Sequence, residues 1–388
     1  MTSTSRNRIY PVFLPHEGCP FQCVYCNQHA VTDSSLKKSS DKGLLSRFDA
    51  CFGRLVEHAE RSGIPGELAF YGGTFTALPE EALKGLLQRV SLWVEKGVFT
   101  GIRFSTRPDG ISREVCALLR EYPVRTVELG VQSLSDQVLQ ESRRGYSAKT
   151  VENAAALVRA NGWELGFQLM LGLPGDTRER FLDSVSRSAL LRPDMVRLYP
   201  TLVLDKTLLA KWYRAGSYQP LDLDDAVEWA ADAYDIFGEA QIPIARMGLH
   251  ADPELEKPGN ILGGPYHPAF GYLVKVRWWR KRVDRYLEKE VQAHGGVSLI
   301  LHVSSPCSSE MIGPRRSNLL HWQRRWNLEH VEVQGNDAIP AGSFHSEWGR
   351  KASVGGRRRR KREWNPGEYP DAGIAVNRCA DSDSFRLE

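Results

Sequence analysis

Three cysteines near the N-terminus have the residue type and the spacing of a metal-cluster site. Cys19, Cys23 and Cys26 follow the pattern C-x3-C-x2-C, and the other four of the seven cysteines are scattered along the chain. Thiolates are soft ligands that suit iron–sulfur clusters. A cubane of four irons and four sulfides has four iron corners, so three thiolates leave one iron without a protein ligand. That open iron can bind a substrate or a cofactor.

S-Adenosylmethionine can occupy such an iron through its amino and carboxylate groups. An electron passed to its sulfonium would release a carbon radical, a reaction for which a protein needs a cofactor. Tyr25, directly before the third cysteine, could lie against an adenine face. The alternative is a structural zinc site, in which His16 or His29 completes a tetrahedron with the three cysteines. The cysteine spacing alone leaves both interpretations open.

Length and composition are those of an ordinary soluble protein. The 388 residues are enough for one large domain or two medium ones. The longest apolar runs are too short to span a membrane, and no signal peptide precedes Ile9. An odd number of cysteines is a poor disulfide framework for a chain of this size. We therefore expect a cytoplasmic protein with no membrane partner.

A basic block near the C-terminus accounts for the positive net charge. The stretch 350–362 contains eight Lys and Arg residues and no acid. Without these eight, the chain has 43 basic and 47 acidic residues, a net charge of −4. The block could contact RNA or another polyanion, although such blocks are more often solvated tails.

Strand-like and helix-like patterns alternate from residue 9 to about residue 200. Six short apolar runs suit buried parallel strands: Ile9–Leu14, Leu68–Tyr71, Gly101–Phe104, Thr126–Val131, Leu165–Leu171 and Met195–Tyr199. Amphipathic helical stripes lie between them. Six successive βα units predict an α/β fold with a parallel sheet and right-handed crossovers. A partial (β/α)6 barrel, an incomplete relative of the TIM barrel, accommodates them.

Polar motifs follow the predicted strands at the ends where barrels carry their chemistry. The cysteine loop follows the first strand, and Gly72-Gly73-Thr74 follows the second. Ser105 ends the third strand, Gln132 follows the fourth, and the run Gly-Leu-Pro-Gly-Asp-Thr at 172–177 follows the fifth. The glycine pair would let backbone carbonyls approach a ligand closely. We therefore expect one ligand site at this edge of the sheet.

The rest of the chain divides by composition. We expect a core partial barrel over 1–200, a small α/β extension over 201–334 and a disordered basic tail over 335–388, where periodicity disappears. Residues 297–303 have the pattern of a strand. His267, in a glycine-rich run, could be a substrate-facing acid or base or a hydrogen-bonded loop residue. The sequence identifies no catalytic side chain.

With these motifs combined, the chain resembles the radical S-adenosylmethionine (radical SAM) superfamily over roughly residues 9–320. The motifs are the cysteine loop, Gly72-Gly73-Thr74, the Gly-Val-Gln-Ser run ending at Ser133 and the run at 172–177. The segments 70–79 and 196–201 are similar to the branch related to the catalytic subunit of Elongator. That subunit has an acetyltransferase domain after its radical core, which we do not expect in this chain.

The resemblance implies a role for each matching residue. It makes Cys19, Cys23 and Cys26 the ligands of a 4Fe-4S cluster. It gives Tyr25 a contact to adenine, Gln132 a contact to the ribose and Arg144 a contact to the carboxylate, and it places Gly72, Gly73 and Thr74 at the methionyl end. Ser105 stands where relatives often carry Glu, and Gln168 where they often carry Asp. Both departures put those cofactor contacts in doubt.

The resemblance also implies an enzyme that cleaves S-adenosylmethionine to a 5′-deoxyadenosyl radical, with a low-potential electron donor and with tRNA as the expected substrate. Two alternatives remain open. One is a haem chaperone of the coproporphyrinogen oxidase-like branch, which shares the Gly-Val-Gln-Ser motif but usually has Phe where this chain has Asn27. The other is a zinc-stabilised RNA-binding module.

Overall fold

The computed structural model of the chain describes residues 8–14, 17–20, 23–27, 41–249, 253–294, 298–349 and 360–361. Its contacts divide the chain into two compact units, the first of residues 1–223 and 248–268, the second of residues 224–247 and 269–388. None of the helices in the described ranges combines the length and the hydropathy that crossing a bilayer requires.

A parallel sheet forms the centre of the first unit. Its strands run in chain order, and each of these neighbouring pairs is parallel. They are β1 (Arg8–Leu14), β2 (Gly66–Gly72), β3 (Phe99–Thr106), β4 (Val124–Gln132), β5 (Glu164–Leu171) and β6 (Met195–Pro200). The predicted α/β partial barrel is therefore confirmed. The sheet order ends with β8 (Ile244–Met247), so the sheet has seven strands where we expected six.

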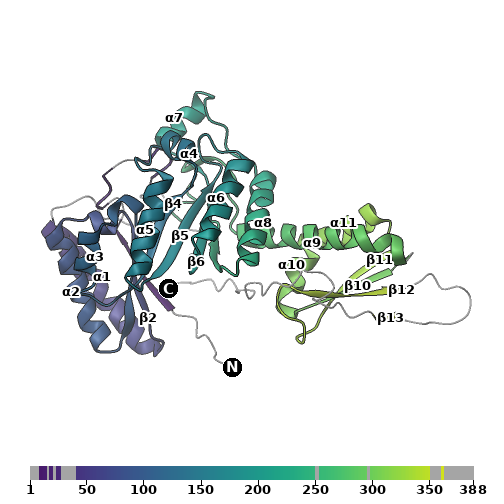
Figure 1. Cartoon of the computed structure of the whole chain (residues 1–388), viewed down its shortest axis with the longest axis horizontal. Helices are drawn as coiled ribbons and strands as arrows, with labels where there is room; N and C mark the ends of the chain where they lie inside the picture. The colour runs from purple at the N-terminus through teal and green to yellow at the C-terminus, as the bar shows by residue number, and fades with distance from the viewer. Residues whose placement is uncertain are drawn as a thin grey trace, which may run out of the picture. The chain divides into compact units, whose positions relative to one another are not determined.

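Helices fill the connections between these strands. They are α1 (Asp41–Ser62), α2 (Glu80–Glu95), α3 (Arg113–Leu119), α4 (Asp136–Glu141), α5 (Ala148–Ala160) and α6 (Arg178–Leu190). Hydroxyl caps begin three of them: the side chains of Ser112, Ser147 and Thr177 each accept a hydrogen bond from the backbone three residues on. Figure 1 shows α5 and α6 alongside β4 and β5.

The two faces of the sheet differ because side chains alternate along a strand. One face is apolar and holds the core, which includes a stack of Phe70, Phe75 and Phe104 with ring centroids 4.6 and 4.9 Å apart. The alternate positions carry polar and charged side chains on every strand from β2 to β6. They are Glu67, Tyr71, Arg103, Thr126, Glu128, Gln168 and Arg197.

The first unit extends past residue 200, where we expected its boundary. It includes β7 (Val203–Leu204), α7 (Leu208–Arg214) and β9 (Ile261–Gly263), and β7 pairs with β9. The reason is packing against the cysteine loop. Val24 and Tyr25 lie against Leu209 and its neighbours on α7, and the Leu209 N–H donates to the Val24 carbonyl at 2.8 Å.

The second unit packs helices against a small mixed sheet of order β11-β10-β12-β13. Its elements are α8 (Leu223–Glu239), α9 (Phe270–His294), β10 (Ser298–Val303), α10 (Ser308–Ile312), α11 (Ser317–Trp326), β11 (His330–Gly335), β12 (Phe344–Gly349) and β13 (Arg360–Lys361). The strand predicted over 297–303 corresponds to β10. The predicted absence of structure after residue 335 is wrong for β12, which pairs with β10 and buries Phe344 and Trp348 at alternate positions.

Candidate functional site

Close backbone contact joins the cysteine loop to the loop after β2. The N–H of Gly73 donates to the Leu14 carbonyl at 2.9 Å, and the N–H of Thr74 donates to the Glu17 carbonyl at 2.8 Å. A Cβ on Gly73 would lie 1.7 Å from the Glu17 oxygen, and a Cβ on Gly18 would lie 2.3 Å from the Thr74 oxygen. The glycines that we assigned to cofactor approach are thus needed first to let these two loops pack together.

The three sequence-predicted cysteines lie on this loop, and two of them face polar partners. The Cys19 Sγ lies 3.4 Å from the Thr74 hydroxyl, and Thr74 is buried. The Cys23 Sγ is buried and accepts a hydrogen bond from the Arg144 Nη1 at 2.9 Å. The Cys26 N–H donates to the Cys23 carbonyl at 3.1 Å, which makes a tight turn between the second and third cysteines.

Arg144, for which the resemblance implied a contact to the cofactor carboxylate, lies beside the cysteine loop. Its guanidinium is buried and already donates to four protein groups: the Cys23 Sγ, the Tyr25 hydroxyl at 3.1 Å, the Tyr146 hydroxyl at 2.8 Å and the Gly130 carbonyl at 2.8 Å. These bonds tie the cysteine loop to the end of β4. In this structure Arg144 therefore orients Cys23 and Tyr25.

The other predicted contacts are distributed along the same edge of the sheet. Ser105 and Gly73 line one small cavity together with Glu17 and Tyr71. Gln132 ends β4 with a left-handed φ of 64°, a backbone conformation that brings its side chain back toward Gly130, where an added Cβ would lie 3.0 Å from the Gln132 Nε2.

Gln168 lies deeper in the barrel and bonds to a residue that the sequence analysis missed. Its Nε2 donates to the Glu128 Oε2 at 3.0 Å. Glu128 is 1% exposed and also accepts from the Arg197 Nε at 2.8 Å, the Arg103 Nη1 at 3.1 Å and the Tyr71 hydroxyl at 2.8 Å. One carboxylate thus connects side chains from five strands.

A second buried carboxylate extends this system toward the amino ends of the strands. Glu67 accepts from the Arg103 Nε at 2.9 Å and from the Thr126 hydroxyl at 2.7 Å. We call the seven residues at the alternate positions of β2 to β6 the inner network. Its two glutamates and two arginines balance in charge, as buried ions must if they are to remain stable.

The inner network controls the ionisation of its own members. Burial alone would raise the pKa of Glu128, but Arg197 and Arg103 hold it below its ordinary value. Burial, together with the adjacent Glu128 charge, raises the pKa of Tyr71 far above its ordinary value. Tyr71 therefore stays a neutral hydrogen-bond donor, while Glu128 stays charged at neutral pH.

A sequence signal for the inner network was present but was interpreted differently. Glu67, Arg103, Glu128 and Arg197 stand inside or beside apolar runs at the period of two that marks one face of a strand. These runs predict buried parallel strands. A charged residue on the same face of successive strands indicates in addition a polar barrel interior.

The loop after β5 contains a partly buried carboxyl with a different environment. The Asp176 side chain accepts from the backbone N–H groups of Gly172 and Thr177, both at 3.1 Å. Burial raises the pKa of Asp176 to about 7, although these N–H groups and Arg180 act against the rise. The loop is further held by the Tyr218 hydroxyl, which donates to the Gly172 carbonyl at 2.6 Å.

The residue types suit an iron–sulfur cluster, because thiolates are its usual protein ligands. Across the described parts of the chain, no three His, Cys, Asp or Glu side chains gather closely enough to share a metal ion. The three thiols nevertheless share one loop at the carboxyl edge of the sheet. His16 and His29, the alternative zinc ligands, lie outside the described residues.

Two family models match most of the described chain. Residues 13–187 match the radical SAM superfamily, and residues 193–280 match the radical SAM C-terminal domain. The first match runs from the end of β1 through the cysteine loop and β5 into α6, and the second runs from just before β6 to the middle of α9.

Curated relatives and a solved structure agree with these matches. The chain is 28% identical over 232 residues to a tRNA uridine(34) acetyltransferase of Dehalococcoides mccartyi, covering 52% of this chain and 50% of the relative. It is also 28% identical over 242 residues to human Elongator complex protein 3, covering 54% and 44%. The chain spans about half the length of these relatives. The solved archaeal Methanocaldococcus infernus Elp3 shares the fold, with a TM-score of 0.53 at 22% identity over 74% of this chain and 64% of that one.

Proposed function

Because the chain belongs to the radical SAM superfamily, with homology to Elongator complex protein 3, we propose that it is a cytoplasmic enzyme that uses a 4Fe-4S cluster and S-adenosylmethionine to modify tRNA. The observation that carries the proposal is the cysteine loop, packed against Gly73 and Thr74 at the carboxyl edge of a parallel half-barrel. Active sites of barrel enzymes lie at this edge.

The chain's own residues would divide the work between holding and orienting. Cys19, Cys23 and Cys26 would supply the thiolates, and Arg144 would compensate their negative charge from its place beside Cys23. Tyr25, whose hydroxyl accepts from Arg144, would offer its ring to the adenine. A bound cluster would supply the electron that cleaves S-adenosylmethionine to methionine and a 5′-deoxyadenosyl radical.

The loops around the cysteines would hold the cofactor. Gly72, Gly73 and Thr74 would contact its methionyl end, and Gln132 its ribose. Ser105, beside Gly73 in one small cavity, could add a hydroxyl contact. Gln168 is committed to Glu128, so we propose that it acts through the inner network and not by direct contact with the cofactor.

The substrate class comes from the relatives. Those with the printed name tRNA uridine(34) acetyltransferase supply the reason to propose tRNA for this chain. The radical would abstract a hydrogen atom from a nucleoside placed at the strand ends. Bases of single-stranded loops can be turned out of a stack into such a pocket.

Metal content tests the cluster. After anaerobic reconstitution with iron and sulfide, we expect the wild-type chain to hold about four irons, as a cubane requires. Cys23→Ala should lose most of the iron. Cys51→Ala is the matched control, because Cys51 lies on α1 and its thiol donates to the Phe48 carbonyl. One zinc per chain with negligible iron would support the zinc-module alternative and contradict the proposal.

Nucleoside analysis tests the substrate. The reduced, reconstituted protein is incubated with S-adenosylmethionine and bulk tRNA, and digested nucleosides are compared by mass spectrometry. A new modified nucleoside that depends on Cys23 is the expected result. A protein that retains its iron but leaves tRNA unmodified and binds haem in a titration would favour the haem-chaperone alternative.

A further inference from the structure

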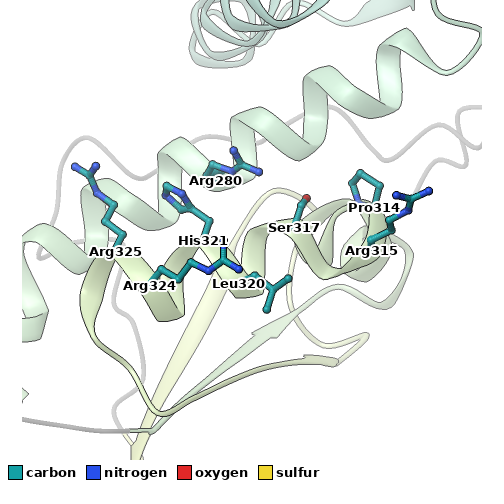
Figure 2. Close-up of a pocket in the computed structure, with 8 residues that line it drawn as sticks. All are labelled: Arg280, Pro314, Arg315, Ser317, Leu320, His321, Arg324 and Arg325. Atoms are coloured by element: carbon teal, nitrogen blue, oxygen red, sulfur yellow. The ribbon is translucent and has the colours of Figure 1, made fainter.

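An open groove in the second unit is lined by positively charged side chains, and its residues are far from the cysteine loop in the sequence. It has a volume of about 660 Å³ and lies between α9 and α11 (Figure 2). Its polar lining consists of Arg280, Arg315, Ser317, His321, Arg324 and Arg325. We call it the α9/α11 groove. All but Arg280 lie beyond residue 280, where the family matches end, so neither match assigns it a role.

The charged lining is held in place by the helices themselves. Ser317, His321 and Arg324 stand at positions i, i+4 and i+7 of α11, so they share one face of that helix. From α9, the Arg280 Nε donates to the Asn318 Oδ1 at 2.9 Å. Asn318 is fully buried and its amide donates to the carbonyls of Val276 and Met311. The groove wall is therefore a rigid part of the fold.

Acids do not balance the arginines of this groove. In the part of the chain that the structure describes, Arg315, Arg316 and Arg324 are exposed and form no ion pair. Asp284 is the acid that faces the groove from α9, and it is already engaged by the His321 Nε2 at 2.7 Å. Its other oxygen accepts from the Trp326 Nε1 at 2.8 Å, with the Arg325 Nε 3.9 Å away.

The backbone at the start of α11 adds a further feature that suits an anion. Arg315 and Arg316 both have left-handed backbone angles, with φ of 51° and 61°, and Ser317 then enters the helix. The Arg316 N–H donates to the Gly313 carbonyl at 3.1 Å and the Ser317 N–H donates to the Pro314 carbonyl, so what suits an anion here is the positive partial charge of the α11 N-terminus. The Ser317 hydroxyl oxygen is buried and has no hydrogen-bond partner among the described residues.

We propose that the α9/α11 groove binds the phosphodiester backbone of an RNA strand. The ten residues of α11 rise about 15 Å, so the arginines from 315 to 325 extend well beyond the size of one phosphate. Guanidinium groups bind phosphate oxygens by paired hydrogen bonds. The inference deepens the proposed function, on which it rests for the choice of RNA, by assigning the polynucleotide a second contact surface.

Fluorescence anisotropy with labelled bulk tRNA tests the groove in the full chain. The variant Arg315→Gln/Arg324→Gln should bind about tenfold more weakly at low salt. The slope of log K against log salt should become shallower by about 1.4, because about 0.7 is lost for each single-stranded phosphate contact removed. The control Arg54→Gln/Arg120→Gln makes the same change in net charge at exposed positions of the first unit and should bind as the wild type does.

Several outcomes would overturn the assignment. Wild-type affinity in Arg315→Gln/Arg324→Gln, with an unchanged urea midpoint, would remove the groove from RNA binding. An equal loss in the control variant would reduce the effect to overall charge. Displacement of the RNA by poly-glutamate at the same charge concentration would assign the groove to an acidic protein. If the wild-type chain fails to cleave S-adenosylmethionine yet binds RNA through these arginines, the proposed function fails and the groove assignment stands.

Discussion

The inner network and the α9/α11 groove use the same side chains in opposite ways. In the inner network, two arginines meet two glutamates, and each charge has a hydrogen-bonded partner. Glu67, Glu128 and Arg103 are buried, and the Arg197 side chain is 13% exposed. In the groove, arginines outnumber the one facing acid and most are exposed. Paired, buried arginines stabilise an arrangement, whereas unpaired, exposed arginines remain available to an external anion.

The difference separates positioning from binding in this molecule. The inner network links successive strands and so fixes the spacing of the strand ends that carry the cysteine loop and its neighbours. The groove should contribute little to the stability of the fold, because its exposed Arg315 and Arg324 form no ion pair among the described residues. Mutations in the two regions should therefore act on different observables.

The largest effect is expected from Glu128→Ala. The substitution leaves the mostly buried Arg197 and Tyr71 without their shared acceptor, and removal of one partner of a buried ion pair costs about 3–5 kcal/mol. Urea unfolding measures the loss. Glu80→Ala is the control, since the Glu80–Lys84 pair lies on the surface of α2 and its loss should leave the urea midpoint nearly unchanged. Equal effects of the two substitutions would contradict the comparison.

Asp176 sharpens the comparison, because this partly buried carboxyl accepts from backbone N–H groups and, among the described residues, from no guanidinium of the kind that bonds Glu128. Its pKa of about 7 in the folded state exceeds its ordinary value of 3.8. Between these values the folded state binds more protons than the unfolded state, so the free energy of unfolding should fall as pH rises from about 4 through about 7. The fall is at most about 4 kcal/mol, and Asp176→Asn should remove it.

The contribution of Glu128 should have the opposite sign. Its pKa in the folded state is lowered, so its stabilisation is present above its ordinary pKa and is lost as pH falls through the folded value. Unfolding curves measured from pH 3 to pH 8 on the wild type and on Asp176→Asn separate the two. A wild-type stability that rises steadily to pH 8, with no change in the variant, would refute the assignment to Asp176.

Gly73→Ala tests the packing of the cysteine loop against the loop after β2. The added Cβ would lie 1.7 Å from the Glu17 carbonyl oxygen, so the loop must move away. We expect a loss of about 2–3 kcal/mol in the free energy of unfolding and reduced iron uptake on reconstitution. Gly53→Ala is the matched control, because its Cβ meets open space on α1 and alanine favours a helix. Full iron uptake by Gly73→Ala would show that the contact does not position the cysteines.

The smallest effect on stability is expected from Arg324→Gln. Its side chain is exposed and forms no ion pair among the described residues, so the free energy of unfolding should stay within about 0.5 kcal/mol of the wild type. Thermal unfolding provides the measurement. A loss of about 2 kcal/mol or more, on the order of a buried contact, would show that this arginine stabilises the fold.

The sequence predicted the parts of the fold that depend on periodicity. Short apolar runs separated by amphipathic helices predicted the parallel sheet of a partial barrel, and the strand predicted over 297–303 corresponds to β10. The gathering of Cys19 and Thr74 was also expected, because the carboxyl ends of neighbouring parallel strands share one edge.

Other features depend on contacts between distant residues, which a pattern along the chain does not encode. Three of the four partners of Arg144 come from positions 14 to 121 residues away, so its orientation toward Cys23 could not be read from its motif. The strand β12 is six residues long and lies in a segment rich in Gly and Arg, and it is stabilised by pairing with β10. The inner network could have been inferred from Glu67, Arg103 and Glu128, which lie on the same face of successive strands, had the barrel interior been considered polar.

The release of 5′-deoxyadenosine tests the central claim most directly. The protein is reconstituted anaerobically, reduced with dithionite and incubated with S-adenosylmethionine, and products are quantified by chromatography. We predict 5′-deoxyadenosine and methionine in equal amounts from the wild type and from Cys51→Ala, and neither from Cys23→Ala. No 5′-deoxyadenosine from wild-type protein that holds its full iron content would contradict the assignment of Cys19, Cys23 and Cys26 to a radical-generating site.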